Sequence, residues 1–386
     1  MFLISDEILY SNSARGHFRV GFTEKHGMAV ELSKYPPSGV EYSFIEPVPS
    51  SNKFIRSPIK GYLNQYKNSE YDLIEAILSP ILTKTRWIYY LENIQAATTF
   101  SLLGFPLPRQ IRVAYLKSLF LKDNFKKLLF WSKAGKETLH TYGKIKSETI
   151  LKKTAVVYPA VRDVPDYSIR FTNDQNLNIL FSGDFFRKGG VNVIDAFERA
   201  QRIYPKINLL LCCDEKMDFN TTDTSLRAEY LRKIHCNKGI RRYGRVPRDR
   251  IIDTILPSTD IYLLPTYAEA FGYAILEAMA FGIPIISTNL FAIPEMVEHN
   301  KSGFLIDIGM YNCDKLFKGY VINKIPRDFR EHVTNHLFDY LCKLIESPDL
   351  RESFGRVGLS IARTKFSFRE RNMKMSQIYH EVLARN

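Results

Sequence analysis

The sequence lacks the features that mark secreted, membrane-spanning or cysteine-rich proteins. Its N-terminus does not show a charged segment, a long apolar segment and a cleavage site in that order, so no signal peptide is predicted. No uninterrupted apolar run reaches the ~18–20 residues that a membrane-spanning helix needs. The five cysteines are an odd number and lack the spacing of a metal or redox motif. We therefore expect a cytoplasmic protein with reduced thiols.

Acidic residues are scarce relative to basic ones, and the formal net charge is +13. Such an excess favours an acidic partner, namely nucleic acid, anionic lipid or a phosphate-bearing substrate. Residues 106–154 carry twelve lysines and arginines against three acids. Within them, 109–130 alternates basic and bulky apolar residues, as interfacial helices do. Two interpretations stay open for this stretch: solvated helix faces, or a patch that binds an anionic membrane surface. Nucleic-acid binding is not expected, because no recognition helix and no aromatic-basic RNA motif is found.

The C-terminal half alternates strand-like and helix-like segments. The strand-like runs are 177–185, 207–213, 239–246, 260–266, 283–289 and 303–307. The helical patterns between them are 190–204, 225–236, 248–256, 272–281 and 292–299. This alternation predicts a parallel sheet with helices on both faces.

The N-terminal half is less regular but indicates a second α/β sheet. Its strand-like segments are 41–48, 71–78, 86–93, 126–132 and 154–161, and its helix-like segments are 57–68, 107–121 and 134–143. The predicted fold class is therefore α/β, with two Rossmann-like, doubly wound domains facing across a cleft. We place the first domain at 1–165, joined by a terminal helix at 366–386, and the second at 166–365. Ligands of such sheets bind at the carboxyl ends of the strands.

The stretch FSGDFFRKGG, residues 181–190, joins a predicted strand to a predicted helix through glycines. The free N–H groups of a helix's first turn and its dipole attract an anion, and Lys188 adds a full positive charge there. The stretch does not have the spacing of a P-loop or of a dinucleotide-binding fingerprint. Taken alone, it leaves phosphate binding and a purely structural turn both open.

Two glutamates, Glu269 and Glu277, lie in the apolar segment YAEAFGYAILEAMAFGIPIIS. Glu269 follows a predicted strand and Glu277 lies within the next predicted helix. Carboxylates at two depths of one cleft would suit a ligand with several hydroxyl groups. Equally, Glu269 would be an exposed loop residue and Glu277 a solvent-facing helix residue. The spacing alone does not choose between these interpretations.

The order of the surrounding motifs carries a resemblance to a known family. The two glutamates, with seven residues between them, lie in PTYAEAFGYAILEAMAFGIPIISTN, which PEMVEHNKSGFLI follows. LFSGDFFRKGG and YGRVPRDRIIDTILPSTDIYLLPT precede them. This set resembles the signature of family 4 glycosyltransferases of the GT-B fold, which are retaining enzymes that use nucleotide sugars. The resemblance is strong over 177–307, fair over 126–176 and 360–383, and faint before residue 126.

The resemblance implies a role for each matched position. Glu269 would contact hydroxyls of the transferred sugar and stabilise charge in the transition state, while Lys188 would neutralise the leaving diphosphate. Glu277 would hold the ribose hydroxyls. The other implied donor-binding positions are Gly183, Arg187, Gly189, Arg245, Val246, Phe271, Gly272, Tyr273 and Ala274. No metal or other cofactor is expected, because such enzymes use cationic side chains and helix dipoles in place of a divalent ion.

Three features depart from the family's pattern. Asp184 stands where many members carry an arginine, so Arg187 becomes the candidate for a second phosphate cation. Ala270 stands where a glycine is usual. The N-terminal half has no clear glycine-glycine acceptor loop and no obvious active-site histidine. The nearest acceptor-side candidates are His17, Glu92 and Asn93.

These observations predict a retaining glycosyltransferase that moves a sugar from a nucleotide-diphosphate sugar to a hydroxyl of a glycan or lipid-linked saccharide. The protein would be cytoplasmic, with peripheral binding to the inner face of a membrane through 109–130. The alternative, which Asp184 and the atypical N-terminal half keep open, is a catalytically weak relative. Such a protein would act as an interaction module that binds nucleotides or anionic surfaces.

Overall fold

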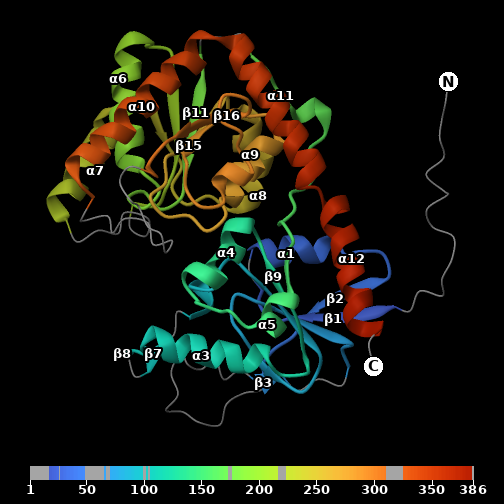
Figure 1. Cartoon of the computed structure of the whole chain (residues 1–386). Helices are drawn as coiled ribbons and strands as arrows, with labels where there is room; N and C mark the ends of the chain where they lie inside the picture. The colour runs from blue at the N-terminus through green and yellow to red at the C-terminus, as the bar shows by residue number, and fades with distance from the viewer. Residues whose placement is uncertain are drawn as a thin grey trace, which may run out of the picture.

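The structure is a computed structural model that describes residues 17–25, 27–47, 65–66, 70–98, 101–102, 105–172, 176–215, 223–309 and 325–384. Its two main sheets lie one above the other, each with its own set of helices (Figure 1). All strand pairs within these two sheets are parallel. The prediction of two Rossmann-like α/β sheets is therefore confirmed.

The first sheet has the order β10-β9-β6-β4-β1-β2. Its strands are β1 (Phe18–Phe22), β2 (Val40–Phe44), β4 (Leu73–Ile77), β6 (Trp87–Leu91), β9 (Phe125–Phe130) and β10 (Thr154–Val156). Every residue of β4 and β6 is buried, because helices cover both faces of the sheet. Two small ribbons add β3 (Gln65–Tyr66), β5 (Leu82–Thr83), β7 (Ser101–Leu102) and β8 (Phe105–Pro106).

The second sheet has the order β13-β12-β11-β14-β15-β16. Its strands are β11 (Asn178–Ser182), β12 (Asn208–Cys212), β13 (Ile240–Arg242), β14 (Ile261–Leu264), β15 (Ile285–Thr288) and β16 (Gly303–Ile306). The strand order reverses between β11 and β14, since the chain extends the sheet in one direction up to β13 and then in the other. Ligands of doubly wound sheets bind at such a switch point, outside the carboxyl ends of the two strands.

Helices surround each sheet. Those of the N-terminal half are α1 (Gly27–Lys34), α3 (Arg109–Phe120), α4 (Lys133–Thr141) and α5 (Glu148–Lys152). Those that follow are α6 (Gly190–Ile203), α7 (Thr224–Cys236), α8 (Arg248–Arg250), α9 (Tyr273–Ala280), α10 (Arg327–Glu346), α11 (Pro348–Lys365) and α12 (Phe368–Ala384). None of the helices in the described part of the chain has both the length and the hydropathy that crossing a bilayer requires.

The last helix, α12, runs down to the first sheet beside β1 and β2 (Figure 1). The Tyr379 hydroxyl on α12 donates to the Glu75 carboxylate on β4 at 2.6 Å and lies 2.8 Å from the Tyr42 hydroxyl on β2. Arg371, also on α12, has its Nη2 atom 3.9 Å from Glu75 Oε1. Both charged side chains are almost completely buried. The C-terminal helix is thus fixed to the N-terminal sheet by a buried polar cluster.

Most predicted elements are present, with some exceptions. β1 and α1 were not predicted, and neither were α10 and α11. The helix predicted at 292–299 is wrong, because only a short 3₁₀ turn forms at Ile293–Glu295. The helix predicted at 57–68 lies mostly outside the described residues, and Gln65–Tyr66 within it form a strand.

We expect Arg371→Met to lower the free energy of unfolding by about 3–5 kcal/mol, because it would leave Glu75 as a buried carboxylate without a cation. Urea denaturation would measure the loss. Arg369→Met, an exposed position on the same helix, is the control and should change little. The double variant Glu75→Leu/Arg371→Met should be more stable than Arg371→Met alone. Equal stability of Arg371→Met and the unmodified chain would show that the cation does not compensate Glu75.

Candidate functional site

The loop after β11 brings a lysine to the switch point of the second sheet. β11 ends at Ser182, and Gly183 turns the chain with a φ of +102°, in the left-handed region that favours glycine. Gly189 precedes α6 with a φ of +81°. A Cβ atom on Gly189 would lie 2.1 Å from the Pro265 carbonyl oxygen, so no other residue fits between the two loops. These glycines place Lys188 against the loop that follows β14.

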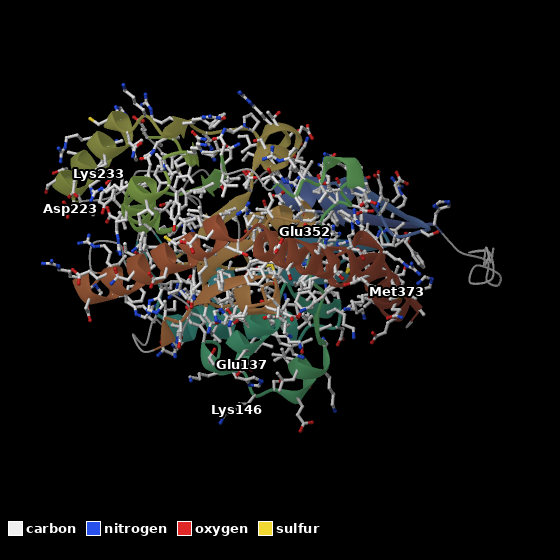
Figure 2. The ribbon with its side chains drawn as sticks, turned by 90° about the horizontal axis from the view of Figure 1, so that it is seen from above. Glu137, Lys146, Asp223, Lys233, Glu352 and Met373 are labelled. Atoms are coloured by element: carbon white, nitrogen blue, oxygen red, sulfur yellow. The ribbon has the colours of Figure 1, made fainter. Side chains whose placement is uncertain are left out.

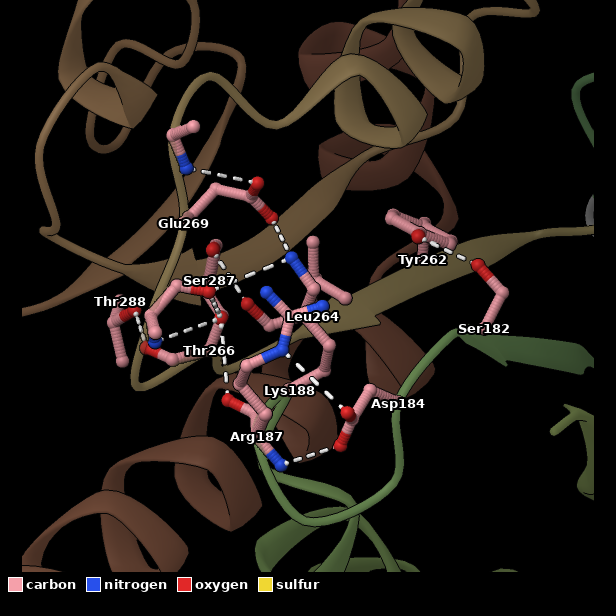
Figure 3. A network of polar contacts seen from close by, with 12 residues as sticks. Ser182, Asp184, Arg187, Lys188, Tyr262, Leu264, Thr266, Glu269, Ser287 and Thr288 are labelled. Atoms are coloured by element: carbon pink, nitrogen blue, oxygen red, sulfur yellow. Dashed lines mark hydrogen bonds and ion pairs between the residues drawn. The ribbon is translucent and has the colours of Figure 1, made fainter. Parts of the chain in front are cut away.

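Lys188 and Glu269 form an ion pair in this position (Figure 3). Nζ of Lys188 contacts Glu269 Oε2 and also lies 3.5 Å from the Ala268 carbonyl oxygen. Each of the two charged side chains is only 13% exposed. The interpretation of Glu269 as an exposed loop residue is therefore wrong. The phosphate-loop lysine and the first motif glutamate, which the sequence places in separate motifs, share one site.

The first turn of α9 supplies free backbone donors next to this pair. Gly272 precedes the helix with a φ of +93°. Within the described residues, the backbone N–H groups of Phe271, Gly272 and Tyr273 donate to no protein acceptor. The N–H group of Ala270 donates to Glu269 Oε1 at 3.1 Å, which fixes that carboxylate. Free N–H groups and the helix dipole make this turn suitable for an anion.

Glu277 lies deeper on α9 and is largely buried, so the solvent-facing interpretation is wrong for it too. Its Oε1 atom accepts a hydrogen bond from Arg248 Nε at 2.6 Å. Burial raises the pKa of Glu277, and the adjacent Arg248 opposes that rise. The sequence did not single out Arg248, although it lies in the motif segment that starts at Tyr243.

A carboxylate from the other half of the chain joins this pair. Nη1 of Arg248 donates to Glu31 Oε2 at 2.9 Å, and Arg162 donates to both Glu31 oxygens at 2.8 and 3.0 Å. The Glu31 side chain is completely buried. Burial opposes its ionisation, but the hydrogen bonds from Arg162 and Arg248 lower the pKa of Glu31 to about 2. The sequence did not single out Glu31, which lies on a helix that was not predicted and that buries half of its residues.

Asp184 and Arg187 interact with each other. The Arg187 guanidinium lies 3.5 Å from Asp184 Oδ2, and the Arg187 N–H donates to Asp184 Oδ1 at 3.0 Å. The Arg187 side chain is 54% exposed and does not contact Glu269. Its charge is partly balanced by the residue that replaces the family's usual arginine. Lys188 is therefore the cation paired with Glu269, whereas Arg187 lies near enough to Glu92 to oppose the rise of its pKa.

The three acceptor-side candidates have different positions. Glu92 follows β6 at the carboxyl edge of the first sheet, and burial, together with the nearby Glu269, raises its pKa to about 7. Within the described residues, the Glu92 carboxyl makes no hydrogen bond or ion pair. Asn93 is buried, and its Oδ1 accepts from the Ala96 N–H at 2.8 Å, so it caps a turn. His17 precedes β1 at the amino edge of the sheet, and its acceptor-side assignment stays a prediction.

The predicted base-pocket residues follow β13. Gly244 has a φ of +68°, Arg245 is exposed and Val246 is partly buried. Ala274 lies in the first turn of α9 and is partly buried. Taken together, the switch point carries one lysine, two carboxylates and the free N–H groups of a helix. This set can bind a ligand that has both phosphates and hydroxyl groups.

Comparison with known proteins points the same way. Residues 168–318 match the family model described as glycosyl transferases group 1, and they include Lys188, Glu269 and Glu277. The chain is 32% identical over 81 residues to N-acetyl-alpha-D-glucosaminyl L-malate synthase of Bacillus anthracis, which covers 21% of this chain and 20% of that protein. It is 25% identical over 240 residues to alpha-maltose-1-phosphate synthase of Mycolicibacterium smegmatis, which covers 60% of this chain and 55% of that protein. These matches span from a fifth to just over half of the curated relatives' length.

Solved structures match over nearly the whole chain. HepE of Anabaena, solved in complex with UDP and glucose, aligns with a TM-score of 0.63 and 16% identity. The alignment covers 95% of this chain and 100% of that one. A likeness at this identity shows the fold, which is the two-domain GT-B fold. The matched family model lies within the second domain of this fold.

We expect Glu92→Gln to change how stability depends on pH. The folded protein holds the Glu92 proton up to about pH 7, whereas the unfolded chain releases it near the ordinary glutamate pKa. This group therefore lowers the stability of the unmodified protein as pH rises from about 5 to 7. Melting temperatures across that range should favour the variant increasingly at higher pH. A difference in melting temperature that stays constant with pH would contradict the raised pKa.

Proposed function

We propose that this chain is a retaining glycosyltransferase that moves a sugar from a nucleotide-diphosphate sugar to an acceptor hydroxyl. One observation carries the proposal: the Lys188–Glu269 pair lies at the switch point of the second sheet, inside the segment that matches group 1 glycosyl transferases. The pair lies beside the glycine loop before α6 and the unpaired N–H groups of the first turn of α9, and such groups can bind a diphosphate.

In the proposed reaction, the bond between the sugar's C1 and the diphosphate oxygen breaks while the acceptor oxygen forms a new bond to C1 on the same face. The acceptor's proton passes to the departing phosphate oxygen. Lys188 and the N–H groups of Phe271, Gly272 and Tyr273 stabilise the charge that develops on the diphosphate. Binding of the diphosphate draws Lys188 away from Glu269, which then accepts hydrogen bonds from the sugar's hydroxyls.

Glu92 is our proposed acceptor-side residue. Glu92 comes from the opposite sheet, and its carboxyl makes no hydrogen bond or ion pair within the described residues. Glu269 lies close enough to contribute to the raised pKa of Glu92. A carboxyl in this position can hydrogen-bond the acceptor hydroxyl. Asn93 would act indirectly, by holding the turn that carries Glu92.

A structural neighbour suggests which donor to test first. HepE was solved with UDP and glucose, so UDP-glucose is the first donor to test. The curated relatives are named for different acceptors, and we propose a glycan or lipid-linked saccharide here. We also propose that the reaction needs no divalent metal, because Lys188 and the helix N-termini supply the positive charge.

The main test is a nucleotide-release assay with a panel of nucleotide sugars and acceptors, run in the presence of EDTA. Glu269→Gln should lower kcat by about 100-fold or more, and Lys188→Ala should weaken nucleotide-diphosphate binding about tenfold, since each removes a preorganised charge from the site. Glu298→Gln and Lys206→Ala, which change exposed residues outside the site, are the matched controls.

Circular dichroism would confirm that each variant keeps its fold. Turnover by Glu269→Gln at the unmodified rate would reject its assigned role, and dependence on added metal would reject metal independence. Nucleotide binding without turnover of any donor would favour the interaction module over the enzyme.

For the basic stretch we propose electrostatic binding to an anionic membrane surface. Insertion of α3 is not proposed, because Val113, Leu116 and Leu119 pack into the core and only Ile111 among its large aliphatic residues is exposed. Arg112 donates to the Thr98 carbonyl oxygen at 2.6 Å and is therefore occupied. The available cations include exposed lysines, among which Lys146 projects from the outer edge of the molecule (Figure 2).

We expect the protein to sediment with vesicles that contain anionic lipid and to be released by salt, because surface attraction of this kind is screened. Reversing the charges of Lys122, Lys126 and Lys146 to glutamate should abolish sedimentation. The control reverses three exposed cations of the second domain, Arg202, Lys206 and Lys238. Equal sedimentation of both triple variants, or indifference to lipid charge, would return this stretch to solvated surface.

A further inference from the structure

Four charged residues form a continuous chain between the two halves of the molecule. Glu277 on α9 accepts from Arg248 Nε at 2.6 Å, and Arg248 Nη1 donates to Glu31 on α1 at 2.9 Å. Glu31 in turn accepts from Arg162, in the segment that joins the two sheets, at 2.8 Å. Arg248 thus contacts a carboxylate from each half of the chain. Its guanidinium also lies over the Tyr273 ring, 5.5 Å from the centroid.

Glu31, which lies at the first-domain end of these four charged residues, is held firmly by its hydrogen bonds. Glu31 has no exposed surface, and its low pKa keeps it ionised. Arg162 holds both oxygens of Glu31 in a two-pronged contact, the strongest geometry for this kind of pair. Glu31 is therefore a fixed anion, and it determines where Arg248 lies.

Glu277, at the second-domain end of these four charged residues, can still accept further hydrogen bonds. Arg248 occupies only the Oε1 atom of Glu277, and Oε2 makes no hydrogen bond or ion pair within the described residues. A carboxylate offers about four lone-pair positions, so Glu277 can still accept hydrogen bonds from two ligand hydroxyls. The charged and titratable groups around it are Arg248, Glu31 and Arg162, with Tyr273 on its own helix and Tyr262 on β14.

We propose that Arg248 is a positioning residue that holds the Glu277 carboxylate for the donor's ribose, and that Glu31 of the first domain holds Arg248. Recognition of the ribose by the second domain then depends on the docking of α1 from the first. The inference rests on the proposed function, in which Glu277 binds the ribose hydroxyls. A nucleotide is bound well only when the two domains are in contact.

The experiment measures binding by calorimetry, using the tightest of UDP, GDP and ADP together with its 2′-deoxy analogue. Arg248→Met should weaken binding of the ribose form about tenfold, as expected when a charge-assisted contact is lost. The 2′-deoxy form, which already lacks one of the hydroxyls, should be weakened much less. If Arg248 served only overall stability, Arg248→Met would weaken the binding of both ligands equally.

Two further variants locate the effect. Glu31→Gln leaves Arg248 and Glu277 intact and should weaken the ribose form in the same direction by a smaller factor. Arg248→Lys should recover part of the loss. Arg170→Met is the matched control, because Arg170 also pairs with a buried carboxylate, Asp260, at 2.7 Å, but at the amino edge of the sheet. Its affinity for both ligands should equal that of the unmodified protein.

The pH dependence gives a second readout. Without Arg248, burial should leave Glu277 more readily protonated, so the affinity of Arg248→Met should fall further at pH 6 than at pH 8. The unmodified protein should change less over that range.

The results that would overturn the inference are distinct from those that would overturn the proposed function. Unchanged or tighter binding by Arg248→Met, or equal losses for the ribose and 2′-deoxy ligands, would reject the role of Arg248. Binding that follows the expected pattern without transfer from any donor would reject the enzyme but keep the coupling. If the unmodified protein binds none of the three nucleotides, both are rejected.

Discussion

The Lys188 ammonium and the Glu269 carboxylate lie against each other at the switch point of the second sheet, and both are largely shielded from water. Removing two charges from water costs several kcal/mol for each ion, which their mutual attraction repays only in part. Such a pair adds little to stability, but it keeps a cation and an anion ready for a ligand that carries the opposite groups. The loops around it serve this placement. Gly189 lets the α6 loop approach Pro265, and Gly272 lets the chain turn into α9.

Carboxylates that are partly or fully removed from water also hold the two halves of the chain together. Glu295, after β15, accepts from the Lys133 and Ala134 N–H groups at 2.9 and 2.8 Å, at the N-terminus of α4 in the first domain. The Tyr158 hydroxyl donates to it as well, at 2.8 Å. A carboxylate at a helix N-terminus is favoured by the dipole and satisfies donors that the helix leaves free. Glu295 thus makes one contact between the domains, and Glu31 makes another.

The sequence allowed the second sheet to be predicted because its strands are short apolar runs buried on both faces, separated by clear helical patterns. Fewer elements of the N-terminal half could be predicted from the sequence. β1, FRVGF, is five residues long and contains Arg19 and Gly21, so its composition does not suggest a strand. The order of the motifs suggested one donor site for Lys188 and Glu269, but their ion pair was not predicted. The Glu31–Arg248 contact joins residues that are 217 positions apart, and no local pattern contains that information.

Arg248 and Lys188 have similar surroundings but differ in how fully their neighbouring carboxylates are paired. Arg248 and Lys188 each belong to the second domain, each pairs with a carboxylate of that domain, and each has a glutamate of the first domain nearby. Around Arg248 both carboxylates are in contact and Glu31 stays ionised, while the second oxygen of Glu277 accepts no hydrogen bond within the described residues. Around Lys188, within the described residues, Glu269 is the only carboxylate in contact. Glu92 makes no hydrogen bond within the described residues, and burial raises its pKa to about 7. The cluster around Arg248 is suited to joining the domains while leaving one oxygen of Glu277 for a ligand, whereas the cluster around Lys188 has unsatisfied groups on both sides of the cleft. A ligand that brings phosphates to Lys188 and hydroxyls to Glu269 and Glu92 would satisfy them.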